Sequence, residues 1–200
     1  MIKRHLLPLL ALFAPLMLQA AEAPATAPAS SAAAAAAARN AYRVEVIIFR
    51  QAQPPTGSED YSAEPESRGF GDRRDVSEAP PTVLRQLEDS DLQMNAIAQK
   101  LRNNGSVHVL AHKGWIQTAT TWGRHAGLPL EAFGIAAPDL RGTLYLERGD
   151  LLHFGAFLQL GTAPVYTLSE LRKVRFNEKH FLDHPAFGVV VMVSPTRPDR

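Results

Sequence analysis

The chain of 200 residues contains no cysteine. Disulfide bonds, thiolate metal sites and a cysteine nucleophile are therefore excluded, and so is lipid attachment to a processed N-terminal cysteine. A protein without disulfide bonds has to be held together by its hydrophobic core. Residues 42–200 are numerous enough to form one, because domains of about 150 residues bury roughly 68–70% of the surface of the unfolded chain. We therefore expect a single domain.

A strong charge of either sign is also missing, since 21 Lys and Arg stand against 20 Asp and Glu. A nearly neutral chain has no overall attraction to nucleic acid, so we expect no nucleic-acid partner. The motifs of serine hydrolases, P-loop proteins and dinucleotide-binding proteins are absent from the sequence. We therefore predict a protein that is not an enzyme, that needs no cofactor, and whose charge-driven binding is local.

The N-terminal residues have the layout of an export signal followed by a spacer. A basic start and an apolar run from Leu6 to Leu18 predict a secretory signal peptide over residues 1–20, cut after Ala20. The run is shorter than the ~20 residues of a membrane-spanning helix, so we expect no membrane insertion after signal cleavage. Residues 21–41 are rich in Ala and Pro and predict a flexible spacer.

Residues 42–195 are expected to form one α+β domain, followed by a C-terminal tail at 196–200. Residues 51–89 hold many Pro and Gly residues and predict a long irregular insert. A helix is predicted from Ser90 to Gly105, with a capping box formed by Ser90 and Gln93. The architecture expected is a mostly antiparallel sheet of about five to six strands with this one main helix packed on one face. The predicted strands cover residues 42–50, 107–117, 142–148, 151–160, 165–176 and 187–193.

The stretch of residues 170–195 carries the densest chemistry and is predicted to be a hairpin. A basic strand (170–176) runs into a loop of ionisable residues (177–185), and an apolar strand (187–193) returns. Basic side chains can pair with carboxylates or phosphates of a partner. Trp115, Trp122 and Tyr145 could supply flat apolar surfaces for sugar rings. The predicted binding residues are Arg172, Lys173, Arg175, Glu178, His180, Asp183, His184 and Trp115.

Two histidine pairs have a spacing of four, which suits a metal ion only on a helix. His108 and His112 fall in a predicted strand, where they lie ~13 Å apart at ~3.3 Å per residue. His180 and His184 flank Asp183, and His and carboxylate ligands are common in zinc sites. The H-E-x-x-H pattern of a metalloprotease is absent, and a turn explains the same residues. We therefore predict no metal.

Four segments stand out together: YRVEVIIF, VHVLAHKGWIQ, LRGTLYLERGDLLHF and LRKVRFNEKHFLDHPAFGVVVMVSP. They resemble the CsiV family of periplasmic proteins. The closing pattern of that family is basic-basic-x-basic, then Glu-x-His-aromatic-x-Asp-His-Pro-x-Phe-Gly, and residues 172–188 are similar to it. The resemblance implies peptidoglycan binding and support of cell-wall assembly through an outer-membrane lipoprotein activator of a synthase. It implies no catalytic residue.

We therefore predict a non-enzymatic periplasmic protein that binds peptidoglycan, a cell-wall synthesis regulator protein, or both. Residues 170–188 are the predicted contact surface, with Arg172 and Arg175 facing the carboxylates of peptidoglycan peptides. Two alternatives stay open. One is a metal-dependent cell-wall hydrolase that uses His180, Asp183 and His184, and the other is an envelope adaptor that touches only protein.

Overall fold

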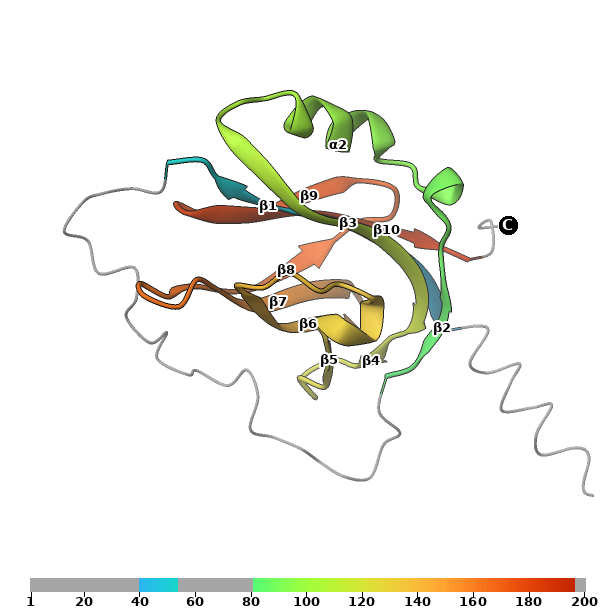
Figure 1. Ribbon diagram of the computed structural model, residues 1–200. Helices are drawn as coiled ribbons and strands as arrows, with labels where there is room; N and C mark the ends of the chain where they lie inside the picture. The colour runs from blue at the N-terminus through green and yellow to red at the C-terminus, as the bar shows by residue number, and fades with distance from the viewer. Residues whose placement is uncertain (1–39, 54–80, 197–200) are drawn as a thin grey trace, which may run out of the picture.

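The computed structural model describes residues 40–53 and 81–196, so the expected signal peptide lies outside the described residues, as do nearly all of the spacer and the tail. The strands form two sheets that lie one above the other (Figure 1). Sheet A consists, in order, of β2 (Val83–Gln86), β3 (Val107–Thr118), β1 (Ala41–Gln51), β10 (Phe187–Pro195) and β9 (Lys179–His184). Sheet B consists of β4 (Thr120–Thr121), β6 (Leu140–Arg148), β7 (Leu152–Leu160) and β8 (Tyr166–Val174), with β5 (Gly127–Pro129) also paired to β6.

The expected α+β architecture is wrong, because the described residues are mostly β and form two sheets. The helices among them are one α-helix, α2 (Asn95–Arg102), and two short 3₁₀ helices, η1 (Asp89–Asp91) and η2 (Leu130–Phe133). No helix of these residues combines the length and apolar character that crossing a bilayer requires. Each sheet packs its inner face against the other sheet, so the main core is built without a helix.

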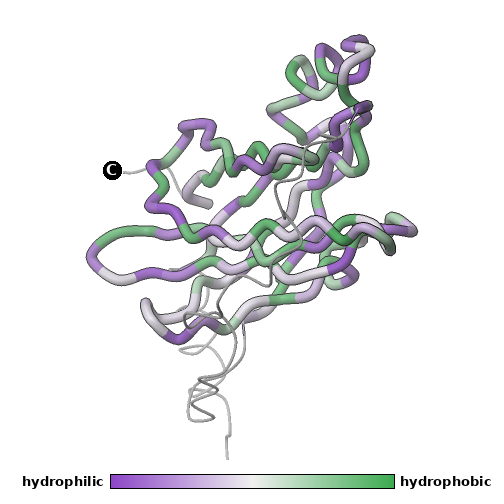
Figure 2. The backbone as a smooth tube through the Cα atoms, turned by 90° about the vertical axis from the view of Figure 1, so that its left-hand side faces the viewer, coloured by the Kyte–Doolittle hydropathy of each residue, from purple (hydrophilic) through white to green (hydrophobic). Residues whose placement is uncertain are grey.

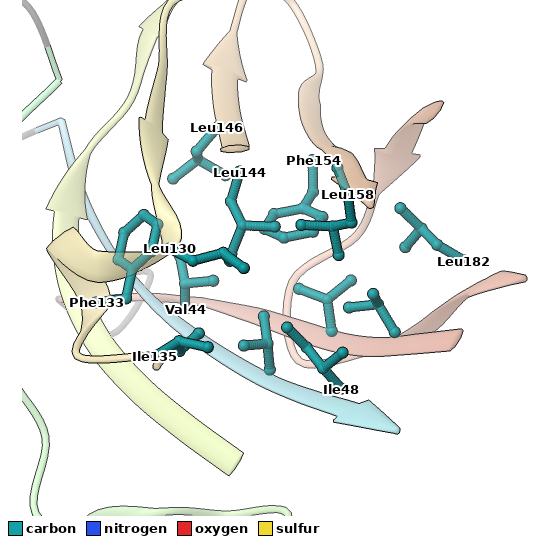
Figure 3. Close-up of a cluster of buried hydrophobic side chains, with 14 of the residues drawn as sticks. Val44, Ile48, Leu130, Phe133, Ile135, Leu144, Leu146, Phe154, Leu158 and Leu182 are labelled. Carbon is teal, nitrogen blue, oxygen red and sulfur yellow. The ribbon is translucent and has the colours of Figure 1, made fainter. Parts of the chain in front are cut away.

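The main hydrophobic core fills the space between the two sheets (Figure 3). Val44, Val46 and Ile48 alternate along β1, are fully buried, and face sheet B. Leu144 and Phe154 meet them from β6 and β7. The period of two along a strand places these residues on one face, and Figure 2 shows hydrophobic and hydrophilic residues alternating along the paired strands. The two inner faces therefore make a core of the sheet-on-sheet kind.

Strands β1 and β3 are direct antiparallel neighbours, although α2 lies between them in the sequence. Strand β2 lies in what was expected to be an irregular insert and pairs with the other edge of β3. Beyond Thr118 the chain continues into β4, which pairs with β6. One continuous path therefore runs from sheet A into sheet B, as the strongly curved β3 in Figure 1 shows.

Helix α2 packs on the outer face of sheet A, where Met94 and Ala98 bury against Ile47 and Met192. The helix is shorter than the predicted range of residues 90–105, and the predicted capping box is not formed. Met94 is the N-cap residue and makes no side-chain capping hydrogen bond. The carboxylate of Glu45 instead accepts hydrogen bonds from the backbone N–H groups of Gln93 (2.8 Å) and Met94 (2.7 Å). A residue far away in the sequence thus takes the role of the local cap.

The C-terminal stretch does not form the predicted hairpin of residues 170–176 with 187–193. Strand β8 pairs with β7 in sheet B, and the residues predicted as a loop contain β9, which pairs with β10. The hairpin is β9–β10, with Pro185 and Ala186 between the strands. The stretch therefore passes from the edge of sheet B to the edge of sheet A.

Candidate functional site

Arg172 lies on β8, opposite Phe154 of β7 and therefore on the core-facing side of sheet B. Because β8 ends the strand order of sheet B, the side chain reaches the solvent and is 46% exposed. Its Nε and Nη2 atoms donate to Glu170 Oε1 at 2.8 Å and 2.7 Å. The guanidinium is therefore accessible, but it is already paired with a carboxylate of its own strand.

Arg175 follows the end of β8, and its side chain is 73% exposed, against 46% for Arg172. Its Nη1 lies 3.7 Å from Glu178 Oε1, a loose and solvent-screened pair. Its backbone N–H donates to His180 Nε2 at 3.0 Å. His180 therefore fixes the backbone at Arg175, while the guanidinium stays open to solvent.

The residues of the alternative metal site are separated by the strand on which they lie. On β9 the half-buried His180 and the buried His184 share a face with the core residue Leu182, while Asp183 points to the other, exposed face. Four residues along a strand separate the two histidines by ~13 Å. No group of three metal-ligating side chains occurs among the described residues. The geometry therefore gives the hydrolase alternative no ion site on this strand.

His184 packs between the rings of Tyr166 and Phe187, and its Nδ1 accepts a hydrogen bond from the Ala186 backbone N–H at 3.0 Å. Burial lowers the pKa of His184 below its ordinary value, against a smaller opposite effect of the Asp183 carboxylate. The imidazole is therefore held neutral and fixes the β9–β10 turn.

Trp115, one of the predicted contacts, is fully buried in the core. Its ring stacks on Phe133 with the centroids 4.0 Å apart, and its Nε1 donates to Gln117 Oε1 at 2.6 Å. Tyr145 is buried as well, and burial, together with the Glu147 charge, raises its pKa above the usual value despite a hydrogen bond with Thr143. We therefore leave both rings out of the candidate contact surface.

The outer face of sheet B brings together a row of groups that the sequence analysis did not connect. Glu147, His153 and Lys173 lie opposite one another on β6, β7 and β8. Trp122, which follows β4, stacks its ring on the imidazole of His153 with the centroids 3.7 Å apart. Lys173 is exposed and therefore places a cation next to this stacked pair. We call Trp122 and His153 the aromatic platform, and Arg172, Lys173 and Arg175 the basic corner.

The row was missed because the predicted strands 142–148 and 151–160 leave only Gly149 and Asp150 between them. A two-residue turn at Gly149 and Asp150 would place Arg148 opposite Leu151, but the turn contains three residues and Arg148 faces Leu152. A slip of one residue changes which side chains share a face. The sequence therefore names Trp122 and Lys173 but not the histidine that lies between them.

The described residues thus form a two-sheet β domain that carries aromatic and basic side chains on its surface. A family model described as "Peptidoglycan-binding protein, CsiV" matches residues 20–161, and the chain belongs to this family. No curated protein and no solved structure matches the chain. The predicted resemblance to this family is confirmed.

The matched residues end directly after β7 and include most of the aromatic platform's row. Trp122, Glu147 and His153 lie inside the match, whereas Lys173 and the rest of the basic corner follow it. The likeness of residues 172–188 to the closing pattern of the family stays a prediction.

Proposed function

We propose that this protein is an exported, non-enzymatic protein of the periplasm that binds peptidoglycan and supports cell-wall assembly. The observation that carries the proposal is the match of residues 20–161 to a family of peptidoglycan-binding proteins. The signal-like N-terminus predicted from the sequence supports the periplasmic location. The contact surface that we propose is the basic corner together with the outer face of sheet B beside it.

Charge supports this choice of surface. Peptidoglycan peptides carry carboxylates, and exposed Arg and Lys side chains bind carboxylates through charge-assisted hydrogen bonds. Lys173 is exposed on the outer face of sheet B, and Arg175 projects beyond the strand end. Arg172 would exchange Glu170 for a ligand carboxylate. The basic corner therefore reaches around one sheet edge and can meet several carboxylates at once.

The test is charge reversal of the corner. The double variant Arg172→Glu/Arg175→Glu should lose sedimentation with purified sacculi, because both contacts become repulsive to carboxylates. Its circular dichroism spectrum should be that of the wild type, since both side chains reach the solvent.

A matched control is Arg85→Glu/Arg102→Glu, which reverses two exposed arginines near sheet A and changes the net charge equally. Arg85 also has a loose carboxylate partner, Asp91, at 3.7 Å, as Arg175 has. Binding retained by the control and lost by the corner variant supports the surface. A folded corner variant that sediments like the wild type removes this assignment.

We also propose a cell-wall synthesis regulator protein as a partner, in line with the resemblance seen in the sequence. Strand β8 ends the strand order of sheet B, and an edge strand offers backbone groups to which a partner strand can pair. Co-purification from cells whose sacculi have been digested tests this partner. A partner that disappears with the wall would show that the wall alone links the two proteins.

A further inference from the structure

Trp122 is a large aromatic residue that the fold holds in place at the surface. Trp122 is 46% exposed, whereas Trp115, the other tryptophan, is fully buried. Its backbone N–H donates to the Arg148 carbonyl at 3.0 Å. A tryptophan that served only packing would be expected inside, because an indole is among the larger apolar groups that folding can bury.

A buried carboxylate anchors the loop that carries this tryptophan. Glu147 has no exposed surface, and it accepts hydrogen bonds from the backbone N–H groups of Gly123 (3.0 Å) and His125 (2.6 Å). Hydrogen bonds to a buried carboxylate are strong, and leaving such a group unpaired is costly. The residues directly after Trp122 are therefore fixed to β6, which limits the positions that the indole can take.

His153 and Gly149 also hold the indole ring in place. The His153 ring covers one face at a centroid distance of 3.7 Å and an interplanar angle of 30°. Gly149 lies beside the base of the side chain, since a Cβ atom there would come within 3.0 Å of Trp122 Cβ. With one face covered, the exposed area of Trp122 belongs to the opposite face and the ring edges. The indole is therefore held between its loop and His153, with its other face open to solvent.

The neighbourhood of this surface is suited to a polar, partly flat ligand. Lys173 lies directly opposite His153 in the β7–β8 pairing and is exposed. Binding sites for small ligands commonly combine an apolar or aromatic surface with a few polar groups that fix orientation. A ring held before binding loses little conformational entropy when it is covered. Pyranose rings offer a flat face of C–H groups with hydroxyl groups at the rim, which fits both features.

We propose that the aromatic platform is a saccharide-stacking subsite that takes a sugar ring of the peptidoglycan glycan strand, with Lys173 meeting oxygen atoms at the rim of that ring. This assignment rests on the proposed function and names the glycan, rather than the peptide, as the part of the wall bound here. The basic corner then binds carboxylates at the edge of sheet B, and the aromatic platform binds sugar faces on the outer face of that sheet. The two sites contact different parts of one polymer.

The experiment measures binding of peptide-free glycan strands, prepared by amidase digestion of sacculi, through tryptophan fluorescence. Trp122 is exposed and Trp115 buried, so a sugar that covers Trp122 should shift the emission to shorter wavelength. Trp122→Ala should abolish this shift and weaken glycan binding about tenfold or more, measured by calorimetry. Trp122→Tyr, which keeps an aromatic face, should retain part of the affinity.

The matched control is Leu84→Ala, since Leu84 is an equally exposed hydrophobic residue on β2 of the other sheet. Glycan affinity that falls in Trp122→Ala and stays unchanged in Leu84→Ala supports the subsite. Undiminished glycan binding by Trp122→Ala overturns it. If wild-type protein sediments with sacculi but does not bind peptide-free glycan, the subsite is wrong and the proposed function stands. If wild-type protein binds neither, both fail.

Discussion

At the scale of single residues, Glu45 shows how a buried charge can be structural. It lies on β1 with no exposed surface, between sheet A and helix α2. Burial raises its pKa, but hydrogen bonds with His112, Gln93 and Met94 outweigh burial, so the net result is a pKa below the usual value. His112 Nε2 lies 2.8 Å from Glu45 Oε1. The ionised carboxylate therefore joins two strands of sheet A to the start of the helix.

Substitution of Glu45 should destabilise the fold without affecting the contact surface. Glu45→Gln replaces one accepting oxygen with an NH₂ group and should lower the free energy of unfolding by about 1–3 kcal/mol. Glu45→Ala leaves all the donors unpaired and should cost about 3–5 kcal/mol. Urea denaturation followed by circular dichroism measures both. Glu131→Gln, at an exposed glutamate, should change stability by less than about 0.5 kcal/mol; an equal effect of Glu45→Gln would contradict the capping role.

Acid should weaken the fold in two stages. The pKa of His184 is lowered by burial, so below a pH of about 6.5 the unfolded chain takes up a proton that the folded protein does not. Stability should therefore fall from that pH until the folded imidazole is itself protonated. The pKa of Glu45 is also lowered, so its contribution is complete above the unfolded value of 4.5 and is lost as pH falls through the folded value.

Urea midpoints measured from pH 8 to well below pH 4 test this order. His184→Gln should flatten the first decline, because no imidazole then titrates at this position. His108→Gln, at an exposed histidine, should leave the curve of the wild type unchanged. A first decline that persists in His184→Gln would assign the effect to another group.

At the scale of elements, the pairing of β6 with β7 depends on a glycine. Gly142 has a φ of 142°, and a Cβ atom there would lie 2.1 Å from the Phe157 carbonyl oxygen and 2.8 Å from Leu158 Cα. Both obstacles are backbone atoms of the neighbouring strand, which cannot move without breaking the ladder. The strand can therefore approach its partner this closely only without a side chain at this position.

Gly142→Ala should lower the free energy of unfolding by about 3 kcal/mol, from backbone strain and overpacking together. Thermal unfolding followed by circular dichroism measures the loss. The control is Gly105→Ala, where a Cβ atom would meet nothing within 4 Å. Similar stabilities of the two variants would show that β6 and β7 can separate at little cost.

Some elements could be predicted from the sequence because their chemistry is local. Strands β6 and β7 alternate apolar with other residues, and that alternation is what one-sided burial requires. Strand β9 was missed because its inward positions are His180, Leu182 and His184, and the two histidines hide the alternation. The cap of α2 was missed for another reason: its acceptor, Glu45, comes from β1, and no local pattern points to it.

At the scale of the whole molecule, the error in fold class has a simple origin. The sequence predicts most of the strands and the helix, but the division of strands between two sheets depends on contacts between distant residues. An α-helix of eight residues is too small to cover even one five-stranded sheet. The second sheet supplies the missing cover, and it turns the predicted hairpin of the C-terminal stretch into a crossing between sheets.

The candidate contact surface could likewise be predicted only in part from the sequence. The basic corner follows from the sequence as a cluster of neighbouring charges, because its residues lie next to each other in the chain. The aromatic platform joins Trp122, in the turn after β4, to His153 on β7, and the three-residue turn after β6 places His153 opposite Glu147. Trp115 was predicted as a contact because tryptophan is a residue type that stacks on sugars, but it is fully buried in the core. Its burial depends on the fold and could not be read from the residue type.

The curved path from β3 into β4 also determines how this protein would bear tension. Trp122 lies a few residues beyond the end of β3, and β3 is hydrogen-bonded to β1 along most of its length. The loop of Trp122 is also hydrogen-bonded to Arg148 and Glu147 of β6, so a pull on this loop would load sheet B through those bonds as well as β3. Tension applied at this loop would therefore be shared between the two sheets and would not fall on one strand alone.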